Sequence, residues 1–245
     1  MENNTQDNYV IHTKNLSKTY GEGEVSVKAV NNVDLHIERG EFTALVGPSG
    51  SGKTTLLNLI GGLDTPTSGE VWVHKVNLSA LSKNRLIDFR LNNIGFVFQA
   101  YNLIPVLTAK ENIEFVMLLQ KRSKEDRDLR INQLLEETGL MDKASKRPNE
   151  LSGGQQQRVA VARALASKPQ FVLADEPTAN LDSQTAEDLL DMMARLNQDE
   201  NMTFIFSTHD QRVIDRARRV ITLVDGTIVS DVIREPTETM APLIK

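Results

Sequence analysis

A segment in the first quarter of the chain has the residue types and spacing of a phosphate-binding loop. It reads Gly47, Pro48, Ser49, Gly50, Ser51, Gly52, Lys53, Thr54. Its glycines allow backbone N–H groups to converge on phosphate oxygens at a helix N-terminus, an approach that larger side chains would block. Lys53 can reach the β- and γ-phosphates of ATP, and the hydroxyl of Thr54 can ligate Mg²⁺, with Thr55 next in the same turn. The segment therefore predicts a site for ATP with magnesium.

The residues on either side decide between a phosphate site and an ordinary glycine-rich turn. The apolar run Phe42 to Val46 precedes the loop, and Thr54 to Ile60 follows it with apolar residues at helical spacing, closed by Gly61 and Gly62. A phosphate site requires this context, in which a strand leads into a glycine loop and the loop leads into a helix. The context favours the phosphate site over the turn.

Two adjacent carboxylates follow another apolar run. Asp175 and Glu176 come directly after Phe171 to Ala174, so they are expected at the carboxyl end of a strand, the edge where parallel α/β sheets bind ligands. Asp175 is placed to hold Mg²⁺ through its water shell, and Glu176 to orient or deprotonate the water that attacks the γ-phosphate. The alternative is a surface turn that begins at Pro177, and the phosphate loop upstream favours the catalytic interpretation.

A histidine and a glutamine follow two further apolar runs. His209 comes after Phe204 to Ser207, and Gln99 comes after Ile94 to Phe98, so both are expected at the same sheet edge. His209 can touch the γ-phosphate, and the amide oxygen of Gln99 can reach Mg²⁺ or the attacking water. Capping or packing against a helix is the commoner use of a histidine in such a place, so position alone leaves both roles open.

A second glycine motif opens another predicted helix. Leu151 to Gln155, with the letters LSGGQ, precedes a run rich in Gln, Arg and Ala from Gln156 to Ala166. The motif offers the hydroxyl of Ser152 and a second set of free N–H groups to an anion. One nucleotide cannot readily use two such helices from the same chain.

The elements that position these residues follow from the pattern of apolar runs and turn residues. Residues 10–46 alternate short apolar runs with glycine turns, which indicates strands. The clearest helix between residues 101 and 148 runs from Lys124 to Thr138, with Ser123 as its N-cap. Further strands are predicted at Phe171 to Ala174, Phe204 to Ser207, Val220 to Val224 and Thr227 to Asp231, and helices at Ser183 to Asn197 and after Asp210. Apolar strands with helices between them indicate an α/β fold with a mostly parallel sheet buried on both faces.

The composition restricts the class of protein. The chain has 245 residues, 40% of them hydrophobic, and can bury one large core. Its net charge of −5 gives no overall attraction to nucleic acid or anionic lipid, and it has no cysteine for disulfides or thiolate metal sites. Met1 to Asn8 lacks the pattern of a secretion signal, and no apolar run approaches the roughly 18 residues that span a bilayer. A function at a membrane therefore requires a partner chain.

The order of these motifs resembles that of the ATP-binding subunit of an ABC transporter, over about residues 10–232. The resemblance implies a P-loop NTPase of ABC type. In this fold an N-terminal antiparallel β subdomain accompanies the mostly parallel core sheet, and an α-helical signature subdomain is inserted at about residues 100–165. The ATPase domain would span residues 10–235, between tails at residues 1–9 and 236–245.

The resemblance also implies roles for individual residues. Tyr20 matches the aromatic side chain that stacks on adenine, and Gln99 matches the contact to Mg²⁺ and to the membrane partner. Glu176 matches the catalytic base, His209 the switch at the γ-phosphate, and Asp182 the loop that communicates across a head-to-tail dimer. In that dimer each ATP lies between the phosphate loop of one subunit and the signature of the second copy. The signature residues are Ser152, Gly153, Gly154 and Gln155.

Three further strings resemble the group that contains lipoprotein-releasing, macrolide-efflux and peptide-efflux ATPases. They are Gly61 to Asp64, Tyr101 to Thr108 and Asn180 to Asp182. The resemblance implies a transmembrane permease partner with few spans and a large extracytoplasmic domain, and a cytoplasmic, peripheral location on the inner face of the cell membrane. The loop Tyr101 to Leu107 is unusually apolar, which favours either a groove for a helix of the partner or ordinary packing between lobes.

The predicted function is that of an ATPase whose dimer closure and reopening drive a separate membrane subunit for efflux or for lipoprotein or peptide release. An alternative is a regulatory module that uses the same chemistry to signal through a membrane partner without moving cargo. A soluble relative that acts on DNA or ribosomes would have two fused cassettes or a long coiled coil, together with a basic stripe. The sequence has none of these features, so no nucleic-acid partner is expected.

Overall fold

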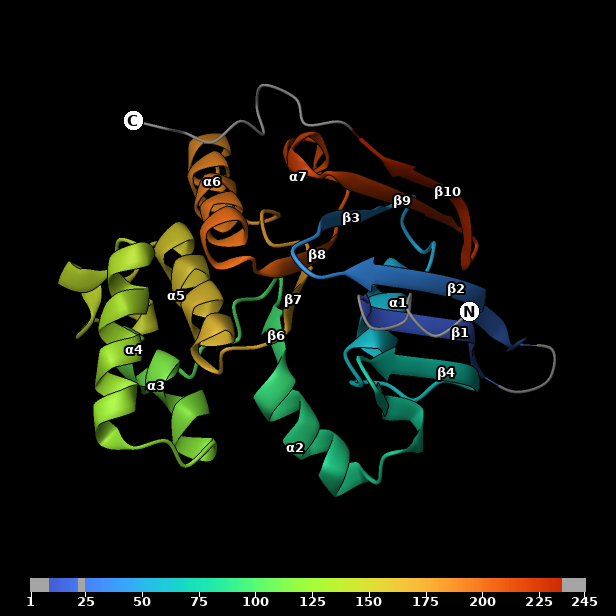
Figure 1. The fold of residues 1–245 in the computed structure, drawn as a ribbon. Helices are drawn as coiled ribbons and strands as arrows, with labels where there is room; N and C mark the ends of the chain where they lie inside the picture. Colours follow the sequence, from blue (N-terminus) through green and yellow to red (C-terminus); the bar gives the residue numbers. More distant parts are fainter. Residues whose placement is uncertain (1–8, 22–24, 235–245) are drawn as a thin grey trace.

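Two β-sheets and a helical lobe make up the part of the chain that the computed structural model describes, residues 9–21 and 25–234 (Figure 1). The predicted tails, residues 1–9 and 236–245, lie outside the described residues, apart from Tyr9, which begins the first strand. Residue 235, the predicted end of the domain, also lies outside them.

The N-terminal part of the chain forms a four-stranded antiparallel sheet, as the resemblance implied. The strands lie in the order β2 (Val27–Glu38), β1 (Tyr9–Tyr20), β4 (Ser68–Val73) and β5 (Val76–Asn77). In the second half of β2, Val33, Leu35 and Ile37 are buried and alternate with exposed residues. Successive side chains of a strand point to opposite faces, so one face of β2 contributes to the core and the other faces solvent.

The second sheet has six strands, and all of its pairings are parallel except that between β10 and β9. The strands lie in the order β10 (Thr227–Ile233), β9 (Arg219–Val224), β3 (Phe42–Val46), β8 (Thr203–Ser207), β7 (Phe171–Asp175) and β6 (Ile94–Val97). Strands β3, β7 and β8 are buried along almost their whole length, because structure covers both faces of the sheet. This burial is why they are continuous apolar runs, and the predicted mostly parallel α/β fold is confirmed.

Helices cover one face of the six-stranded sheet and extend into a separate lobe. The α-helices of the described chain are α1 (Lys53–Ile60), α2 (Lys83–Asn93), α3 (Ala109–Leu119), α4 (Lys124–Glu137), α5 (Gly153–Ala166), α6 (Ser183–Glu200) and α7 (Gln211–Arg216). Short 3₁₀ turns are η3 (Leu78–Ala80), η4 (Met141–Lys143) and η5 (Pro148–Glu150). Helices α3, α4 and α5 lie together on the left of Figure 1, as the predicted inserted helical subdomain requires.

The helices differ in how visible they are in the sequence. Helix α4 begins as predicted, because the hydroxyl of Ser123 accepts a hydrogen bond from the N–H of Asp126 at 3.1 Å. Helix α3 has a capping box between Thr108 and Glu111, which the sequence analysis did not single out. No residue of helix α2 is fully buried, and only Leu86 and Phe89 pack partly buried against the core cluster around α1, so the apolar pattern of α2 is weak.

Buried side chains form two apolar clusters, one on each face of the six-stranded sheet. One cluster includes Phe204 and Phe206 and packs α5 and α6 against the sheet. The other lies between the two sheets and includes Leu56, Leu59 and Ile60 of α1. Because α1 is enclosed between the two sheets, the loop that precedes it has a fixed position.

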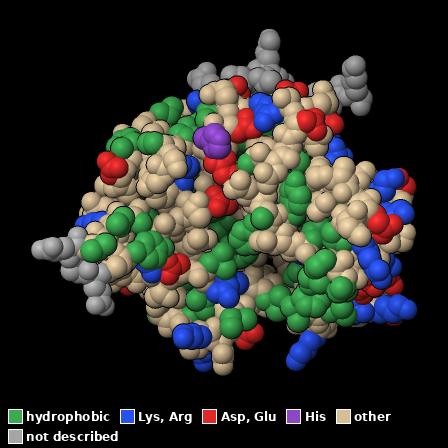
Figure 2. Space-filling view, turned by 180° about the vertical axis from the view of Figure 1, so that it is seen from behind, with side chains coloured by type: hydrophobic (Ala, Val, Ile, Leu, Met, Phe, Trp, Pro, Cys, Tyr) green, Lys and Arg blue, Asp and Glu red, His purple; other side chains and the backbone are tan. Residues whose placement is uncertain are grey.

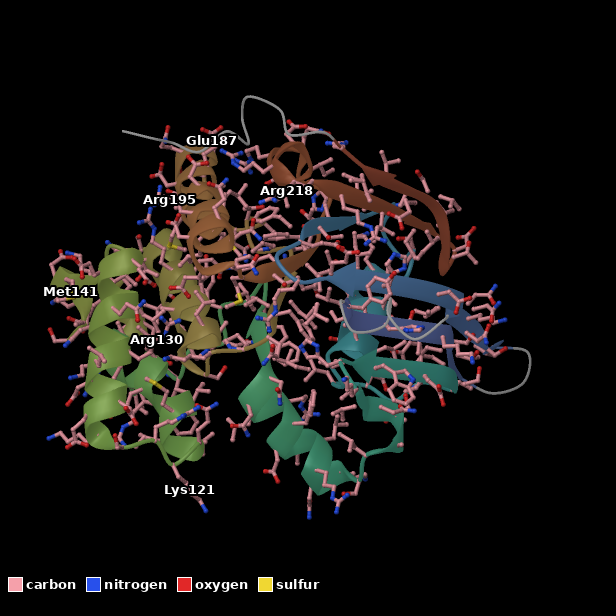
Figure 3. All side chains as sticks on the ribbon, viewed as in Figure 1. Lys121, Arg130, Met141, Glu187, Arg195 and Arg218 are labelled. Atoms are coloured by element: carbon pink, nitrogen blue, oxygen red, sulfur yellow. The ribbon has the colours of Figure 1, made fainter. Side chains whose placement is uncertain are left out.

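Charged side chains tie the helical lobe to the C-terminal part of α6. Arg130 of α4, labelled in Figure 3, lies 3.6 Å from the carboxylate of Glu200 and donates a hydrogen bond to the carbonyl of Leu165 at 3.2 Å. Arg218, near α7 in the same view, donates to the side chain of Asn197 at 2.7 Å. The contacts of Arg130 help to fix α5, which carries the second glycine motif, whereas Arg218 ties α6 to the segment after α7.

Candidate nucleotide site

The phosphate loop lies between the end of β3 and the start of α1. Gly52 is the N-cap of α1 and has a left-handed backbone with φ of 100°. A Cβ atom at this position would lie 2.1 Å from the carbonyl oxygen of Ala29, so a larger residue would force the backbone to move. No side chain of the described residues caps α1, and its first turn has no acidic residue. The N–H groups of this turn are therefore available to an anion.

The ammonium group of Lys53 is held against the loop. It donates to the carbonyl oxygens of Gly47 at 2.8 Å and of Pro48 at 3.0 Å. The cation therefore lies near the positive end of the α1 helix dipole, and both favour negative charge in the same place. This arrangement suits a polyphosphate.

Two of the predicted magnesium ligands are in direct contact. The hydroxyl of Thr54, in the first turn of α1, lies 3.1 Å from each oxygen of the Asp175 carboxylate and donates to it. Asp175 is the last residue of β7, and the two residues are 121 positions apart in the chain. The parallel sheet brings them together because the carboxyl ends of β3 and β7 lie at the same edge.

Glu176 has an unusual backbone and a well-anchored side chain. Its φ is 47°, in the left-handed region that few residues other than glycine adopt. One carboxylate oxygen lies 2.7 Å from Nδ1 of His209, and the other accepts a hydrogen bond from the hydroxyl of Thr208 at 3.2 Å. Because a carboxylate only accepts, Nδ1 of His209 carries the hydrogen. Two donors from the segment after β8 therefore fix the predicted base.

The phosphate loop and the predicted catalytic residues line one cavity of about 570 Å³. Gln99, Glu176 and His209 form part of its wall. The other residues of the wall, outside the loop Gly47 to Thr54, are Ala29, Thr55, Ala179 and Ser207. The structure thus brings together residues that follow β3, β6, β7 and β8, at the carboxyl edge of the sheet.

Tyr20, the predicted adenine contact, does not line this cavity. Its hydroxyl donates to Asp64 at 2.6 Å, and the ammonium of Lys18 lies 4.9 Å from the centre of its ring. The hydroxyl also interacts with Thr55, which does line the cavity. With 44% of the residue exposed, the ring lies beside α1 with surface open to solvent.

The second glycine motif caps α5. Ser152 and Gln155 form a capping box: the Ser152 hydroxyl accepts from the Gln155 N–H at 3.3 Å, and the Gln155 side chain accepts from the Ser152 N–H at 3.0 Å. Gly154 is buried, and a Cβ atom there would lie 2.1 Å from the Cγ2 methyl of Thr185 on α6. Ser152 is exposed, and Gly153 is partly exposed. None of Ser152 to Gln155 lines the cavity, so the two motifs of one chain do not share it.

Asp182 is the N-cap of α6, and its partner Thr185 also contacts the second glycine motif. Its carboxylate accepts from the N–H of Thr185 at 3.0 Å and from the hydroxyl of Thr185 at 2.6 Å. The hydrogen bonds from Thr185 lower the pKa of Asp182. Thr185 therefore contacts Asp182 with its hydroxyl, while its methyl group limits the size of residue 154.

Known proteins resemble this chain over most of its length. Residues 30–179 match the family model described as ABC transporter. The chain belongs to the ABC transporter family. It is 46% identical over 223 residues to the ABC transporter ATP-binding protein MJ0796 of Methanocaldococcus jannaschii, a match that covers 89% of this chain and 95% of that one. As a member of this family, the chain is an ATP-hydrolysing cassette.

Two further relatives and a solved structure narrow the comparison. The lipoprotein-releasing ATP-binding protein LolD of Legionella pneumophila is 42% identical over 219 residues, covering 89% of this cassette and 96% of LolD. The macrolide export ATP-binding/permease protein MacB of Mannheimia succiniciproducens is 42% identical, covering 94% of this cassette but only 36% of MacB. The dimeric post-hydrolysis structure of MJ0796 with ADP and Pi superposes with a TM-score of 0.84 at 44% identity, covering 93% of this chain and all of that one. The predicted resemblance to this group is confirmed.

The cassette also has an apolar groove of about 410 Å³ beside its helical lobe. Its apolar lining includes Leu63, Ile87, Phe96, Phe98 and Val116. Seen from behind, hydrophobic side chains gather around a hollow in the lower half of the molecule (Figure 2). Within the described residues, no helix of the cassette is long and apolar enough to cross a membrane.

The loop Tyr101 to Leu107 was predicted either to form a groove or to pack between lobes. One of its residues lines the groove, and another packs against the core. Only Asn102 of this loop lines the groove. Leu103 packs against the core cluster of the helical lobe, whereas Val106 is exposed. Arg163, which also lines the groove, donates to the carbonyls of Tyr101 and Asn102 and so fixes the loop beside it.

One polar cluster near the cavity was not found in the sequence. The hydroxyl of Thr178 donates to Asp210 at 2.7 Å, and Arg212 pairs with the same carboxylate at 2.7 Å. Although burial raises the pKa of Asp210, the hydrogen bonds from Arg212 and Thr178 outweigh it and lower the pKa to about 2. The cluster ties the loop after Glu176 to the loop after His209. Its residues belong to no recognised motif, so the sequence offered no signal for them.

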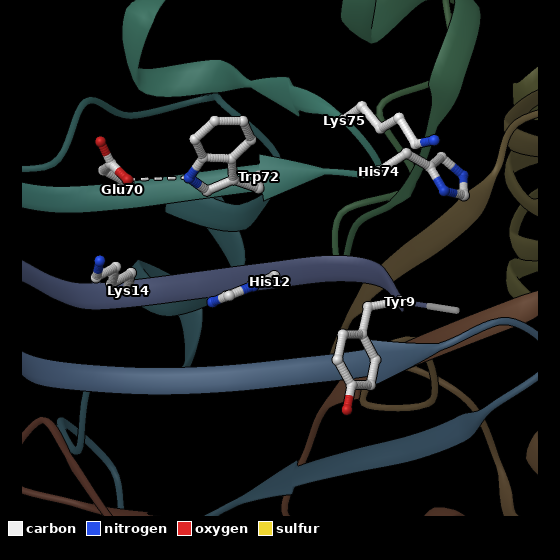
Figure 4. Close-up of a pocket in the computed structure, with 7 residues that line it drawn as sticks. All are labelled: Tyr9, His12, Lys14, Glu70, Trp72, His74 and Lys75. Carbon is white, nitrogen blue, oxygen red and sulfur yellow. Dashed lines mark hydrogen bonds between the residues drawn. The ribbon is translucent and has the colours of Figure 1, made fainter. Parts of the chain in front are cut away.

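A separate cavity of about 370 Å³ lies against the antiparallel sheet of the cassette (Figure 4). Its wall consists of Tyr9, His12, Lys14, Glu70, Trp72, His74 and Lys75. His12 and Trp72 are cross-strand partners, and the indole of Trp72 donates to Glu70 at 3.0 Å. This cavity shares no residue with the nucleotide site.

Proposed function

We propose that this cassette hydrolyses ATP with Mg²⁺ between two copies arranged head to tail, and that closure and reopening of this dimer drive a separate membrane subunit. One observation carries the proposal. The phosphate loop, Glu176 and His209 line a single cavity, whereas the signature at the start of α5 lies outside it. Each chain therefore contributes its phosphate loop to one site and its signature to the other.

The contact between Thr54 and Asp175 fits a magnesium site. A hydroxyl, a carboxylate and the amide oxygen of Gln99 are all oxygen ligands, which Mg²⁺ prefers. When bound, the ion supplies neutralisation of the charge on the β- and γ-phosphate oxygens. Thr54, Asp175 and Gln99 would hold it, because Thr54 and Gln99 line the cavity and Asp175 is bonded to Thr54.

Glu176 is placed to accept a proton from the attacking water. In the single chain its carboxylate is oriented by hydrogen bonds from His209 and Thr208. On binding, Lys53 exchanges its two loop carbonyls for phosphate oxygens, and His209 contacts the γ-phosphate. Tyr20, beside Thr55, would stack on the adenine ring.

The signature residues supply the other half of the site in the second copy. The exposed hydroxyl of Ser152 and the N–H groups that begin α5 form an anion site that the chain's own cavity does not use. In the head-to-tail dimer they would bind the partner's ATP, and Asp182, which shares Thr185 with the motif, would contact the second subunit. The dimeric structure of the relative MJ0796 supports this arrangement.

The groove beside the helical lobe is proposed to receive a helix of the membrane subunit. Its lining of Leu63, Ile87 and Phe98 is apolar, and residues of α2 lie on one side of it. The relatives LolD and MacB are named for lipoprotein release and macrolide export, which supports a membrane partner for this cassette. We propose that this partner is a permease with few spans and a large extracytoplasmic domain. The cassette would then lie on the cytoplasmic face of the membrane, peripheral to that partner.

The variant Glu176→Gln tests the proposal. We expect it to bind ATP with nearly unchanged affinity, to lose at least about a hundredfold in turnover, and to accumulate as an ATP-bound dimer, because glutamine cannot accept the proton. Turnover, nucleotide affinity and ATP-dependent size-exclusion chromatography measure these effects. Glu187→Gln, on the exposed surface of α6, is the matched control. Normal turnover would exclude Glu176 as the base, and an ATP-bound monomer would exclude the shared site.

A further inference from the structure

A buried hydrogen bond joins the signature helix to the residue after the catalytic glutamate. Gln157 lies on α5 and is fully buried. Its side-chain Nε2 donates to the carbonyl oxygen of Pro177 at 2.9 Å. Pro177 follows Glu176 directly, so the amide of Gln157 is bonded one residue away from the predicted base.

This bond connects two segments that serve different ATP molecules under the proposed function. The start of α5 binds the partner's ATP, whereas Glu176 acts on the ATP of its own chain. Gly154 packs on Thr185, and a Cβ atom at Gly153 would lie 3.8 Å from the carbonyl oxygen of Asn180, so the start of α5 packs against the start of α6 and the loop after Glu176. Within this packed region, Gln157 provides the buried polar link to Pro177.

Stability alone gives little reason for a glutamine at this position. Oε1 of Gln157 is buried and has no hydrogen-bond partner among the described residues. A buried amide with one half unpaired is unfavourable, and an apolar side chain of similar size would remove that penalty. The donor half of the amide, aimed at Pro177, is therefore the part that requires glutamine.

We propose that Gln157 is a positioning residue that couples closure of the signature on the partner's ATP to the placement of Glu176 at the chain's own ATP. The inference rests on the proposed function, because it requires the shared site. A displacement of α5 is carried through the bond to Pro177, which adjoins Glu176 with its left-handed backbone. Glu176 therefore reaches its working position when the signature of the same chain is engaged.

Gln157→Met tests the link, because methionine nearly conserves the volume and cannot donate a hydrogen bond. We expect kcat to fall at least about tenfold while ATP affinity and KM change little, since a small misplacement of a catalytic group is costly. Gln156→Met is the control, because the amide of Gln156 donates to the carbonyl of Leu151, just before α5, and not to the loop after Glu176. A kcat of the folded variant within about twofold of the wild type would overturn the proposal.

Mixed dimers separate positioning of Glu176 from simple damage to the signature. One subunit carries Glu176→Gln, so only the other can hydrolyse ATP, and a single-turnover assay measures that one event. Gln157→Met should slow hydrolysis when it lies in the hydrolysing subunit, where it is bonded beside the active Glu176. Slowing only when it lies in the Glu176→Gln subunit would mean that the substitution damages the signature, and this result would overturn the proposal.

A second variant covers the case in which methionine prevents folding. Gln157→Glu has the same shape, and its carboxyl can donate to Pro177 only when protonated. We expect its kcat relative to the wild type to rise as the pH falls from about 8 to about 6, because burial favours the protonated form. A ratio that stays constant would overturn the proposal. Failure of Glu176→Gln to dimerise with ATP would instead overturn the shared site itself.

Discussion

Single residues in the nucleotide site differ in how firmly they are held. Lys53 is bonded to two carbonyls of its own loop, and these bonds are of a kind that phosphate oxygens can replace. Glu176, in contrast, is fixed by two donors and by a backbone conformation that only a well-packed surrounding maintains. In the single chain, the side chain of Lys53 is therefore held by bonds that a nucleotide can replace, whereas Glu176 is held by its neighbours and by its own backbone conformation.

The contact between Thr54 and Asp175 leads to a prediction about metal dependence. Thr54→Val removes the hydroxyl and keeps the shape, so we expect the Mg²⁺ concentration for half-maximal ATPase activity to rise at least about tenfold. Thr54→Ser keeps the hydroxyl and should stay close to the wild type. Titration of activity with Mg²⁺ at saturating ATP measures the effect, and an unchanged Mg²⁺ requirement in the valine variant would remove Thr54 from the metal site.

The low pKa of Asp210 leads to a prediction about acid stability. A pKa of about 2 in the folded chain lies below the value of roughly 3.9 expected in the unfolded chain, so the ionised group stabilises the fold above about pH 4. This contribution is lost as the pH falls through about 2. Asp210→Asn should therefore be less stable than the wild type at pH 5, with a difference that shrinks toward pH 2. Urea unfolding at several pH values measures it, and a difference independent of pH would contradict the assignment.

The candidate site residues that were predicted from the sequence share one property. Phosphate binding itself requires their residue types and their spacing. Gly52, Lys53 and Thr54 are recognisable because a phosphate needs free N–H groups, a cation and a metal ligand in one turn. Thr178 and Arg212 do not line the nucleotide cavity but bond to Asp210 beside it, and any sequence contains many such residues. Their role depends on contacts between segments, which spacing along the chain does not encode.

Among the elements, α5 has the most demanding position. It contributes the signature at its first turn, packs its buried face into the helical lobe, and approaches α6 so closely that residue 154 has no room for a side chain. Buried strands and α1 were predicted because they are apolar on every face or on a regular stripe. Helix α2 was not, because it packs without burying any residue. Burial does not decide every case, because α3 buries Ala109, Ile113 and Met117 and was still not predicted.

The close approach of α5 and α6 can be tested with a pair of substitutions. Gly154→Ala places a Cβ against Thr185, and the overpacking should cost about 1–3 kcal/mol of stability, offset in part by about 1 kcal/mol of helix propensity. Thr185→Ser removes the methyl group and keeps the hydroxyl that bonds Asp182. The double variant should recover most of the loss in urea unfolding. Additive effects would show that the two residues do not compete for the same space.

At the scale of the whole molecule, the candidate site is made at one edge of a sheet, and under the proposed function a second chain completes it. Gln99, Glu176 and His209 follow three different strands, and the parallel sheet alone brings them to the phosphate loop. The family, its fold and this convergence were accessible from the sequence because parallel strands present their carboxyl ends at one edge. The groove lining was not, because residues as distant as Leu63 and Arg163 meet there only in the folded chain.

A shared site makes activity depend on protein concentration. We expect turnover per subunit to fall in proportion to dilution once the protein is below the dissociation constant of its ATP-bound dimer, while ATP binding by the monomer persists. A dilution series with light scattering and ATPase measurements tests this. Activity per subunit that stays constant in strictly monomeric protein would show that one chain hydrolyses ATP alone.

The strand order has a consequence for synthesis of the chain. Strand β3 leads into the phosphate loop, and its two neighbours in the six-stranded sheet are β8 and β9. Both neighbours come near the end of the chain and are therefore synthesised long after β3. A growing polypeptide therefore carries its phosphate loop for most of translation before the loop has a sheet to support it. Pairing between segments so distant in sequence forms late. We therefore expect a nascent or truncated chain that lacks β8 and β9 not to assemble the nucleotide site, because β3 has no strand to pair with and His209 is absent or unplaced.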